Sequence, residues 1–402
     1  MKNNLLLGLA IITMLFSCTT DDTAEIVIND NSDNSVTNNT TTGGGGSETP
    51  TGETIYLTGT FSSNLTLDPI NEYILNGPLI MESGTTLTIP AGMTIKATAG
   101  GANIYIAISQ GAKIQASGTP TNPIVLTSNS STPAAGDWGG LILLGKAPIN
   151  SVTGSATATS EIGSLPYGGT VVNDNSGVIQ YLRVEYSGGA ADGQSENNGL
   201  SFYGVGSGTV VQYIESFEGK DDGLEFFGGT VNASYIYSVN NQDDSIDWTE
   251  GYSGTITHAY VKHGPDHDKA FECDGYNTDF SNAAGYFSKP TVNNVTIIGQ
   301  GNTAGTEAIR LRAGTQGIFN NILIQGFEEG FDLDGDAGDN PTGAGVTSGD
   351  LNVTDVTFTD VTTKVKNDTG VAFNIDGDFI ISGDGNATGT DFATWGTGWS
   401  RE

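Results

Sequence analysis

Acidic residues recur in this chain at similar places in successive segments, and their spacing could build a catalytic site. The pattern occurs in order in Asp221-Asp222-Gly223, Gln242-Asp243-Asp244, Lys262-His263-Gly264 and Arg310-Leu311-Arg312. An inverting glycoside hydrolase needs an acid and a base carboxylate roughly 6.5–9.5 Å apart. Asp222 with Asp243 or Asp244 is the candidate pair. His263 and Arg310 lie in the two segments that follow.

The same residues belong to predicted columns of outward side chains about 4.8 Å apart on neighbouring strands. One column contains Ser201, Glu225, Asp247, Glu272, Arg310 and Asp332. Its neighbour contains Tyr203, Phe227, Thr249, Asp274, Arg312 and Asp334. Carboxylates at this spacing raise one another's pKa unless a cation lies between them. We expect this face to hold metal ions, to pair Glu272 and Asp332 with Arg310, or to contain an acid/base pair; a solvated acidic face is the alternative.

A ligand on this face would contact six residues in particular. They are Glu225, Asp247, Glu272, Arg312, Tyr203 and Phe227. Arg310 or Arg312 could bind the carboxylate of a uronic acid through paired hydrogen bonds. Aromatic rings on a flat face suit sugar rings, and Tyr237, Tyr252 and Tyr276 are expected beside the same face.

Two further clusters could bind metal. The segment Asp332-Leu-Asp334-Gly-Asp336-Ala-Gly-Asp339 is typical of a calcium loop, although its alternation differs from the EF-hand. A structural Ca²⁺ held by Asp332, Asp334, Asp336 and Asp339 is therefore predicted. The three histidines, His258, His263 and His267, could bind a transition metal; exposed loop histidines beside acidic residues are the alternative.

Two interleaved strand patterns must position all these residues. The first consists of a polar residue, a small residue and an apolar-x-apolar pair, beginning at Leu200, Leu224, Ile246, Phe271, Ile309 and Phe331. Its steps are 24, 22, 25, 38 and 22 residues, and a second apolar series alternates with it from Val178 to Ile318. Strands repeating every 22–25 residues predict an all-β fold, a single-stranded right-handed parallel β-helix in which each coil contacts its neighbours. A β-sandwich is the alternative.

Alternation also predicts which side chains point inward. The interior residues would be Leu200, Phe202, Leu224, Phe226, Ile246, Trp248, Phe271, Cys273, Ile309, Leu311, Phe331 and Leu333. Asn293, Asn294, Asn320 and Asn321 are expected at inward-turning corners. The longest step is assigned to an insertion at residues 276–289, and the cap of the first coil to residues 54–80.

Composition limits the classes of partner. With 14 Lys plus Arg against 46 Asp plus Glu, the formal net charge is -32. A chain this acidic repels nucleic acid and anionic membrane surfaces, so no nucleic-acid partner is expected. The cysteines are Cys18 and Cys273, and the interior position predicted for Cys273 indicates a small buried hydrophobe.

The chain divides into three parts. Residues 1–18 form a lipoprotein signal peptide with an apolar stretch too short to span a membrane, 19–53 a flexible Asn/Thr/Gly-rich linker, and 54–402 the β-helix domain. Leu15-Phe16-Ser17-Cys18 resembles the lipobox of bacterial lipoproteins, which implies lipidation of Cys18 as the membrane attachment. Asp21-Asp22 resembles the export signal of surface lipoproteins, which implies an outer-membrane protein exposed at the cell surface.

Several segments resemble a family of secreted bacterial right-handed parallel β-helix proteins of the pectin-lyase-like type. They are Pro123–Ser128, Gly136–Ala147, Asn198–Leu200, Asp221–Asn232 and Trp395–Trp399. The resemblance implies fold and secretion. The order of the acidic, His and Arg segments also resembles that of polygalacturonase-type hydrolases, which implies that His263 and Arg310 join the aspartates in a catalytic set. However, Lys262 stands where those enzymes have Gly, and the first segment lacks their Asn.

From these residues we expect a cell-surface lipoprotein that binds an extracellular ligand, most plausibly a glycan or else a surface protein. It would act as an accessory to an outer-membrane transporter. A polysaccharide hydrolase or lyase is the first alternative, and a structural or adhesive surface protein the second. The missing Asn and the bulky Lys262 beside His263 favour binding over catalysis.

Overall fold

The computed structural model describes residues 35–39, 52–150, 156–191, 196–278, 282–335 and 341–401. The predicted signal peptide and Cys18 lie outside them. Within the described ranges, no helix has both the length and the apolar character that a membrane-spanning helix requires.

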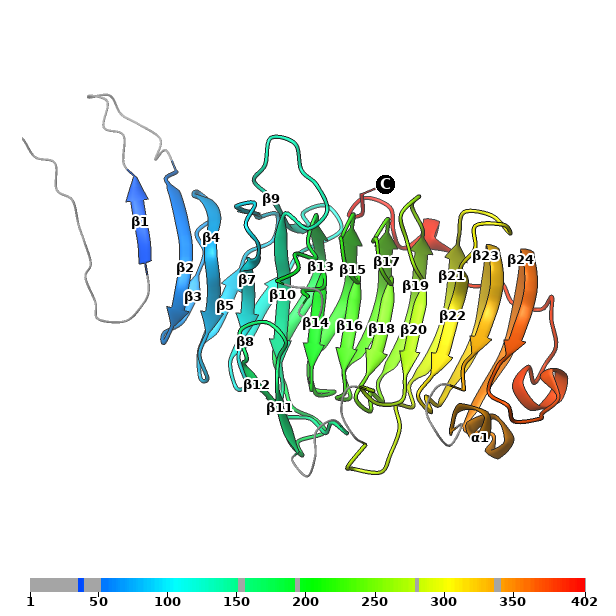
Figure 1. Cartoon of the computed structure of the whole chain (residues 1–402). Coiled ribbons are helices and arrows are strands. Elements are labelled where there is room, and N and C mark those ends of the chain that lie inside the picture. Colours follow the sequence, from blue (N-terminus) through cyan, green and yellow to red (C-terminus); the bar gives the residue numbers. More distant parts are fainter. Residues whose placement is uncertain are drawn as a thin grey trace, which may run out of the picture. The chain divides into compact units, whose positions relative to one another are not determined.

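Strands dominate this part of the chain, and 22 of them form one sheet (Figure 1). The first coils contain β2 (Thr54–Phe61), β3 (Leu65–Thr66), β4 (Glu72–Met81), β5 (Thr86–Ile89), β6 (Thr94–Ala97), β7 (Gly101–Ile108), β8 (Lys113–Ser117), β9 (Ile124–Ser128) and β10 (Trp138–Leu144). The middle coils contain β13 (Gly177–Glu185), β14 (Leu200–Tyr203), β15 (Val210–Phe217), β16 (Leu224–Phe227), β17 (Asn232–Val239), β18 (Ile246–Thr249), β19 (Thr255–Lys262), β20 (Phe271–Asp274), β21 (Thr291–Ile298) and β22 (Glu307–Arg312). The last coils contain β23 (Gly317–Leu333) and β24 (Leu351–Asn367).

Within this sheet, the strands from β2 to β24 pair in parallel, and each pairs with the equivalent strand of the next coil. Leu200 in β14 pairs with Leu224 in β16, which pairs with Ile246 in β18. The alternate strands pair in the same way, with Val211 in β15 opposite Ala233 in β17. Parallel crossovers within one sheet are right-handed in nearly every protein. The prediction of a right-handed parallel β-helix is confirmed.

The interior is a continuous apolar stack, as the alternation predicts. All twelve residues expected to point inward are at most 1% exposed, including Cys273, which is a free buried thiol. Phe202 and Phe226 stack with ring centroids 4.9 Å apart. Aromatic and aliphatic ladders of this kind bury most of the surface that each coil offers its neighbour.

The corner between the two halves of each long strand requires a left-handed backbone. Tyr181, Tyr213, Tyr235 and His258 have φ between 47° and 60°. Asn294 continues this line with φ 57°. The short polar side chain of Asn tolerates this region better than most residues do.

The predicted inward direction of the corner asparagines is wrong. All four are half-buried, and they bond to each other along the stack. Asn320 Nδ2 donates to Asn293 Oδ1 at 2.9 Å, and Asn321 Nδ2 donates to Asn294 Oδ1 at 2.8 Å.

The first coils of the stack differ from the expected cap. Residues 54–80 are ordinary parallel coils, and β1 (Ser35–Asn39), within the predicted linker, pairs antiparallel with β2. At the other end, α1 (Pro341–Ser348) and the helical turn η1 (Ile375–Phe379) follow β23 and β24. The chain then runs through η2 (Phe392–Thr394) back to the middle coils, where its red end lies near β15 in Figure 1.

Candidate functional site

A groove of about 440 Å³ follows the strands β16, β18, β20 and β22 and the turns before them. Its lining consists of Glu161, Glu196, Asn198, Asp221, Asp222, Glu225, Asp243, Asp244, Asp247, Asp268, Lys269, Glu272, Arg310 and Arg312. Ten carboxylates therefore face three basic side chains. The repeated acidic segments do come together, because coils of nearly equal length place equivalent residues side by side.

Two of the aspartates have a structural role in the turns. Asp222 Oδ1 accepts the backbone N–H of Asp244 at 3.0 Å, and Asp244 Oδ1 accepts the N–H of Lys269 at 2.7 Å. Each carboxylate thus holds the turn of the next coil. This explains why Asp recurs at this place and fixes the side chains at the groove floor.

Burial and mutual repulsion raise the pKa of the floor carboxylates. Burial is the largest cause for Asp221, whose pKa rises to about 8 with further contributions from Glu196 and Asp243. Burial likewise raises the pKa of Asp222 well above its ordinary value, and Asp221, Asp244 and other acidic neighbours add to the effect. These groups cannot all be ionised at neutral pH unless positive charge enters the groove.

Three groups of carboxylates at one end of the groove bring their oxygens within 4.8 Å of one another. They are Glu196–Asp221–Asp243, Asp222–Asp243–Asp244 and Asp222–Glu225–Asp247. Asp221 is 7% exposed, and its Oδ2 is buried without a hydrogen-bond partner, as is Oδ1 of Asp247. Buried carboxylate oxygens without donors are suited to a hard divalent cation such as Ca²⁺.

The other end of the groove carries its own cations. Lys269 Nζ lies 3.1 Å from Glu272 Oε1 and 3.8 Å from Asp244 Oδ1. Arg312 Nη2 lies 2.5 Å from Glu272 Oε2, and Arg312 Nε lies 2.6 Å from Asp274 Oδ1. The predicted pairing of Glu272 with Arg310 is present at 3.8 Å, but Arg312 is the closer partner.

The predicted catalytic carboxylates come together in the groove. Asp222, Asp243 and Asp244 each bring one oxygen within 4.8 Å of the others. An inverting hydrolase needs the carboxyl groups of its acid and base roughly 6.5–9.5 Å apart, and the role of these residues as such a pair stays a prediction.

His263 is not among the side chains that line the groove. The ring is 3% exposed and packs against His267 at 4.3 Å and Phe327 at 5.3 Å. Burial lowers the pKa of His263 to about 3, with a smaller contribution from His267. His263 follows β19 in the chain, whereas the groove follows β18 and β20, which explains the separation.

The three histidines do not converge on a metal site. His258 stacks on Tyr235 with ring centroids 5.0 Å apart, and its Nδ1 lies 3.0 Å from Thr390 Oγ1. Across the described part of the chain, the groups of three or more possible metal ligands contain no histidine. Both that metal site and the alternative of exposed loop histidines are wrong for His258 and His263.

The prediction of an exposed aromatic binding surface is wrong for Tyr203 and Phe227, because both rings are buried. Tyr203 and Phe227 are each 2% exposed and stack at 3.9 Å. The segment containing β11 (Thr157–Thr159) and β12 (Pro166–Gly168) covers them, with Tyr167 4.9 Å from Tyr203. Tyr237 and Tyr252 are also buried. Outward-pointing rings on a solenoid gain more from packing under a loop than from facing water.

The predicted calcium loop is partly present. Asp332 and Asp334 come together with Asp368, but Lys366 lies 3.3 Å from Asp332 and Arg310 lies 2.6 Å from Asp334. The protein's own cations thus compete for these oxygens. Asp336 and Asp339 lie outside the described residues, so the structural Ca²⁺ site stays a prediction.

The sequence interpretation missed several groove residues. Glu161 and Glu196 come from loops without repeat periodicity and carry no signal in the sequence. Lys269 was not missed in this way, because the repeat places it at the turn position that is Asp222 and Asp244 in the preceding coils.

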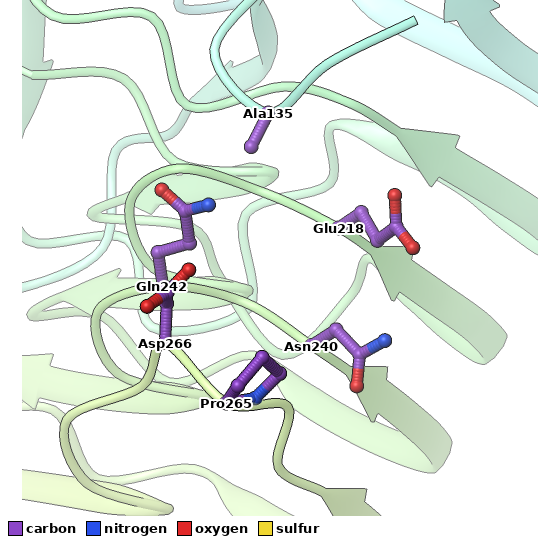
Figure 2. A pocket seen from close by; sticks show the side chains of 6 residues that line it. All are labelled: Ala135, Glu218, Asn240, Gln242, Pro265 and Asp266. Atoms are coloured by element: carbon purple, nitrogen blue, oxygen red, sulfur yellow. The ribbon is translucent and has the colours of Figure 1, made fainter.

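A smaller pocket of about 200 Å³ lies at other turns of the stack (Figure 2). Its lining is Ala135, Glu218, Asn240, Gln242, Pro265 and Asp266. Glu218 and Asn240 follow β15 and β17 directly, while the acidic groove lies at the turns before β16 and β18. This pocket has a mixed lining and holds less acidic charge than the groove.

Comparisons with known proteins agree with this architecture. A family model described as a pectate-lyase-like β-helix domain matches residues 59–400. No curated protein matched the chain. The match spans all the coils that carry the groove, and such a domain fits a glycan-related or hydrolase-like role.

Proposed function

The chain belongs to the family of pectate-lyase-like β-helix domains, and we propose from this premise that its acidic groove binds a glycan with the help of divalent cations. One observation carries the proposal: ten carboxylates and three basic side chains line the groove. In the described part of the chain, no Lys or Arg lies within the 4.0 Å ion-pair distance of six of these carboxylates. They are Glu196, Asp221, Asp222, Glu225, Asp243 and Asp247.

The carboxylate groups fit a hard divalent cation such as Ca²⁺, which takes six to eight oxygen ligands. The protein offers three oxygens in each group, one from each residue, so further ligands have to come from water or from a bound molecule. Sugar hydroxyls and uronic-acid carboxylates are such oxygen ligands. The cation would supply the positive charge that lets an acidic groove accept an acidic or neutral glycan.

The cellular setting belongs to the same proposal. The segment ending at Cys18 supports a lipid anchor in the outer membrane, and the acidic residues after it support exposure at the cell surface. A surface glycan-binding lipoprotein would deliver its ligand to an outer-membrane transporter. A surface protein as ligand is the competing partner class.

The test measures thermal unfolding and glycan binding of the full-length protein. Ca²⁺ should raise the melting temperature by mass action, and binding to polygalacturonate or alginate should vanish when EDTA is added. The double variant Asp221→Asn, Asp243→Asn should weaken the affinity for Ca²⁺ and the affinity for the glycan, each about tenfold or more. Asp350→Asn is the matched control, because Asp350 is an exposed carboxylate paired with Lys289. If Ca²⁺ does not change the melting temperature of the wild type, the proposed role of the cation is refuted.

A polysaccharide hydrolase or lyase is the second candidate. The observation that favours it is the raised pKa of Asp221, about 8, since a carboxyl protonated at neutral pH can act as a general acid. Glu196 and Asp243 each bring one oxygen within 4.8 Å of an oxygen of Asp221, so a second carboxylate is close enough to take part in a two-carboxylate mechanism. New reducing ends or unsaturated products that are lost in Asp221→Asn would establish catalysis.

A further inference from the structure

One turn position of the groove changes from acid to base along the stack. The equivalent residues in four successive coils are Asn198, Asp222, Asp244 and Lys269. Lys269 is 5% exposed, which is unusual for a lysine unless it is paired. Its Nζ lies 2.5 Å from Asp268 Oδ2, 3.1 Å from Glu272 Oε1 and 3.8 Å from Asp244 Oδ1.

The carboxylates around Lys269 would otherwise resemble the cation-binding groups. Oxygens of Asp244, Asp247 and Glu272 lie within 4.8 Å of one another, as in the groups at the other end of the groove. The difference is that the ammonium group of Lys269 contacts two members of this group. A buried ammonium is a point charge with three donors, so it can satisfy several carboxylates at once.

We infer that the ammonium group of Lys269 takes the place of a divalent ion among Asp244, Asp247 and Glu272. Metal binding is thereby confined to the carboxylates at the other end of the groove, around Asp221 and Asp222. The inference rests on the proposed function and names the residue that sets how many cations the groove takes. It also divides the groove, because the end near Lys269, Arg310 and Arg312 is neutralised by the protein itself.

The positions of the basic side chains agree with this division. Lys269 Nζ lies within 4.0 Å of carboxylate oxygens of Asp244, Asp268 and Glu272. No Lys or Arg of the described residues lies that close to Asp221 or Asp222. Asp221 Oδ2, a buried oxygen without a hydrogen-bond partner, lies in the Glu196–Asp221–Asp243 group, which Lys269 does not contact within 4.0 Å. Asp247 Oδ1 also lacks a partner, and Asp247 is shared between the Lys269 group and Asp222–Glu225–Asp247.

The experiment counts Ca²⁺ ions bound by the full-length protein, using equilibrium dialysis with calorimetric titration. Lys269→Gln should bind one Ca²⁺ more than the wild type, because it frees the Asp244–Asp247–Glu272 group. Adding Glu272→Gln to that variant should return the count to the wild-type value. Lys269→Arg keeps the charge and should leave the count unchanged. Lys289→Gln removes an exposed lysine paired with Asp350 and is the matched control.

The outcomes separate the inference from the proposed function. If Lys269→Gln is folded and binds no additional Ca²⁺, the inference is overturned even when the wild type binds Ca²⁺ and glycan. If the wild type binds no Ca²⁺ but Lys269→Gln binds one ion, the proposed function and the confinement of metal to the other carboxylates fail, while the replacement of a divalent ion by Lys269 stands. If Lys269→Gln unfolds in EDTA, recovery of the fold by Ca²⁺ but not by equal ionic strength of NaCl supports the inference. Failure to recover contradicts it.

Discussion

Arg401 Nη1 lies 2.8 Å from Glu185 Oε2, although 216 residues separate the two in the chain. The contact ends a C-terminal segment that returns along the corner of the stack. Thr390 N–H donates to Thr296 Oγ1, and Trp399 packs edge-on against Tyr181 at 5.9 Å. The segment therefore holds coils together that are distant in sequence, and we define residues 386–401 as the C-terminal strap.

Loss of the strap's buried anchor should destabilise the β-helix. Trp399 is buried, and Trp399→Ala removes its contacts with Tyr181 and Tyr213, which should cost about 3–5 kcal/mol of unfolding free energy. Urea unfolding measures the change. Thr397→Ala is the control, since Thr397 is an exposed residue of the same strap. Equal stability of the two variants would show that the strap does not brace the coils.

Stability should fall as pH rises through the neutral range, partly because of Glu215. Burial raises the pKa of Glu215 from its ordinary value of 4.5 to about 8, although the backbone N–H of Arg401 and the charge of Arg183 lower it. Between those values the folded state holds a proton that the unfolded state releases, so the unfolding free energy decreases with increasing pH.

Glu215→Gln should flatten this dependence by at most about 1.4 kcal/mol per pH unit, because one group releases one proton. Chemical unfolding at about pH 5.5 and 7.5, in EDTA so that groove cations do not contribute, measures the slope. A slope that is the same in wild type and Glu215→Gln would contradict the prediction.

Neighbouring positions on β16 should respond in opposite ways to a change of charge. Phe226→Asp places an unpaired carboxylate inside the apolar stack and should abolish folding. Glu225→Gln should preserve the fold and raise the melting temperature in EDTA. Burial raises the pKa of Glu225, and the charges of Asp247 and Glu161 raise it further, so the ionised carboxylate is disfavoured at this position. Circular dichroism follows both variants, and similar behaviour would refute the assignment of the two faces.

Lipid attachment can be measured directly in cells. Labelled fatty acid should be incorporated into the wild type and not into Cys18→Ala, because the lipobox-like segment supplies a single acceptor thiol. Cys273→Ala is the control, since Cys273 is buried in the β-helix. Equal labelling of wild type and Cys18→Ala would remove the anchor from the proposed function.

The sequence by itself determined the fold and the interior of this protein. Residues such as Leu224 and Phe226 alternate with outward residues and recur after one coil, and in a parallel β-helix that local pattern is repeated directly as the register of neighbouring strands. The same periodicity brought Asp222, Asp244 and Glu272 to one groove. Local pattern sufficed because each coil contacts its immediate neighbours.

The tertiary structure decided what covers the outer surface of the coils. Tyr203 and Phe227 alternate like solvent-facing residues, yet the segment around Tyr167 buries them, and Glu161 and Glu196 reach the groove from loops that have no repeat. The strap likewise joins Arg401 to Glu185, and no repeat spacing in the sequence predicts this contact. Loop and tail contacts depend on the path of the chain between coils, and no strand periodicity encodes that path.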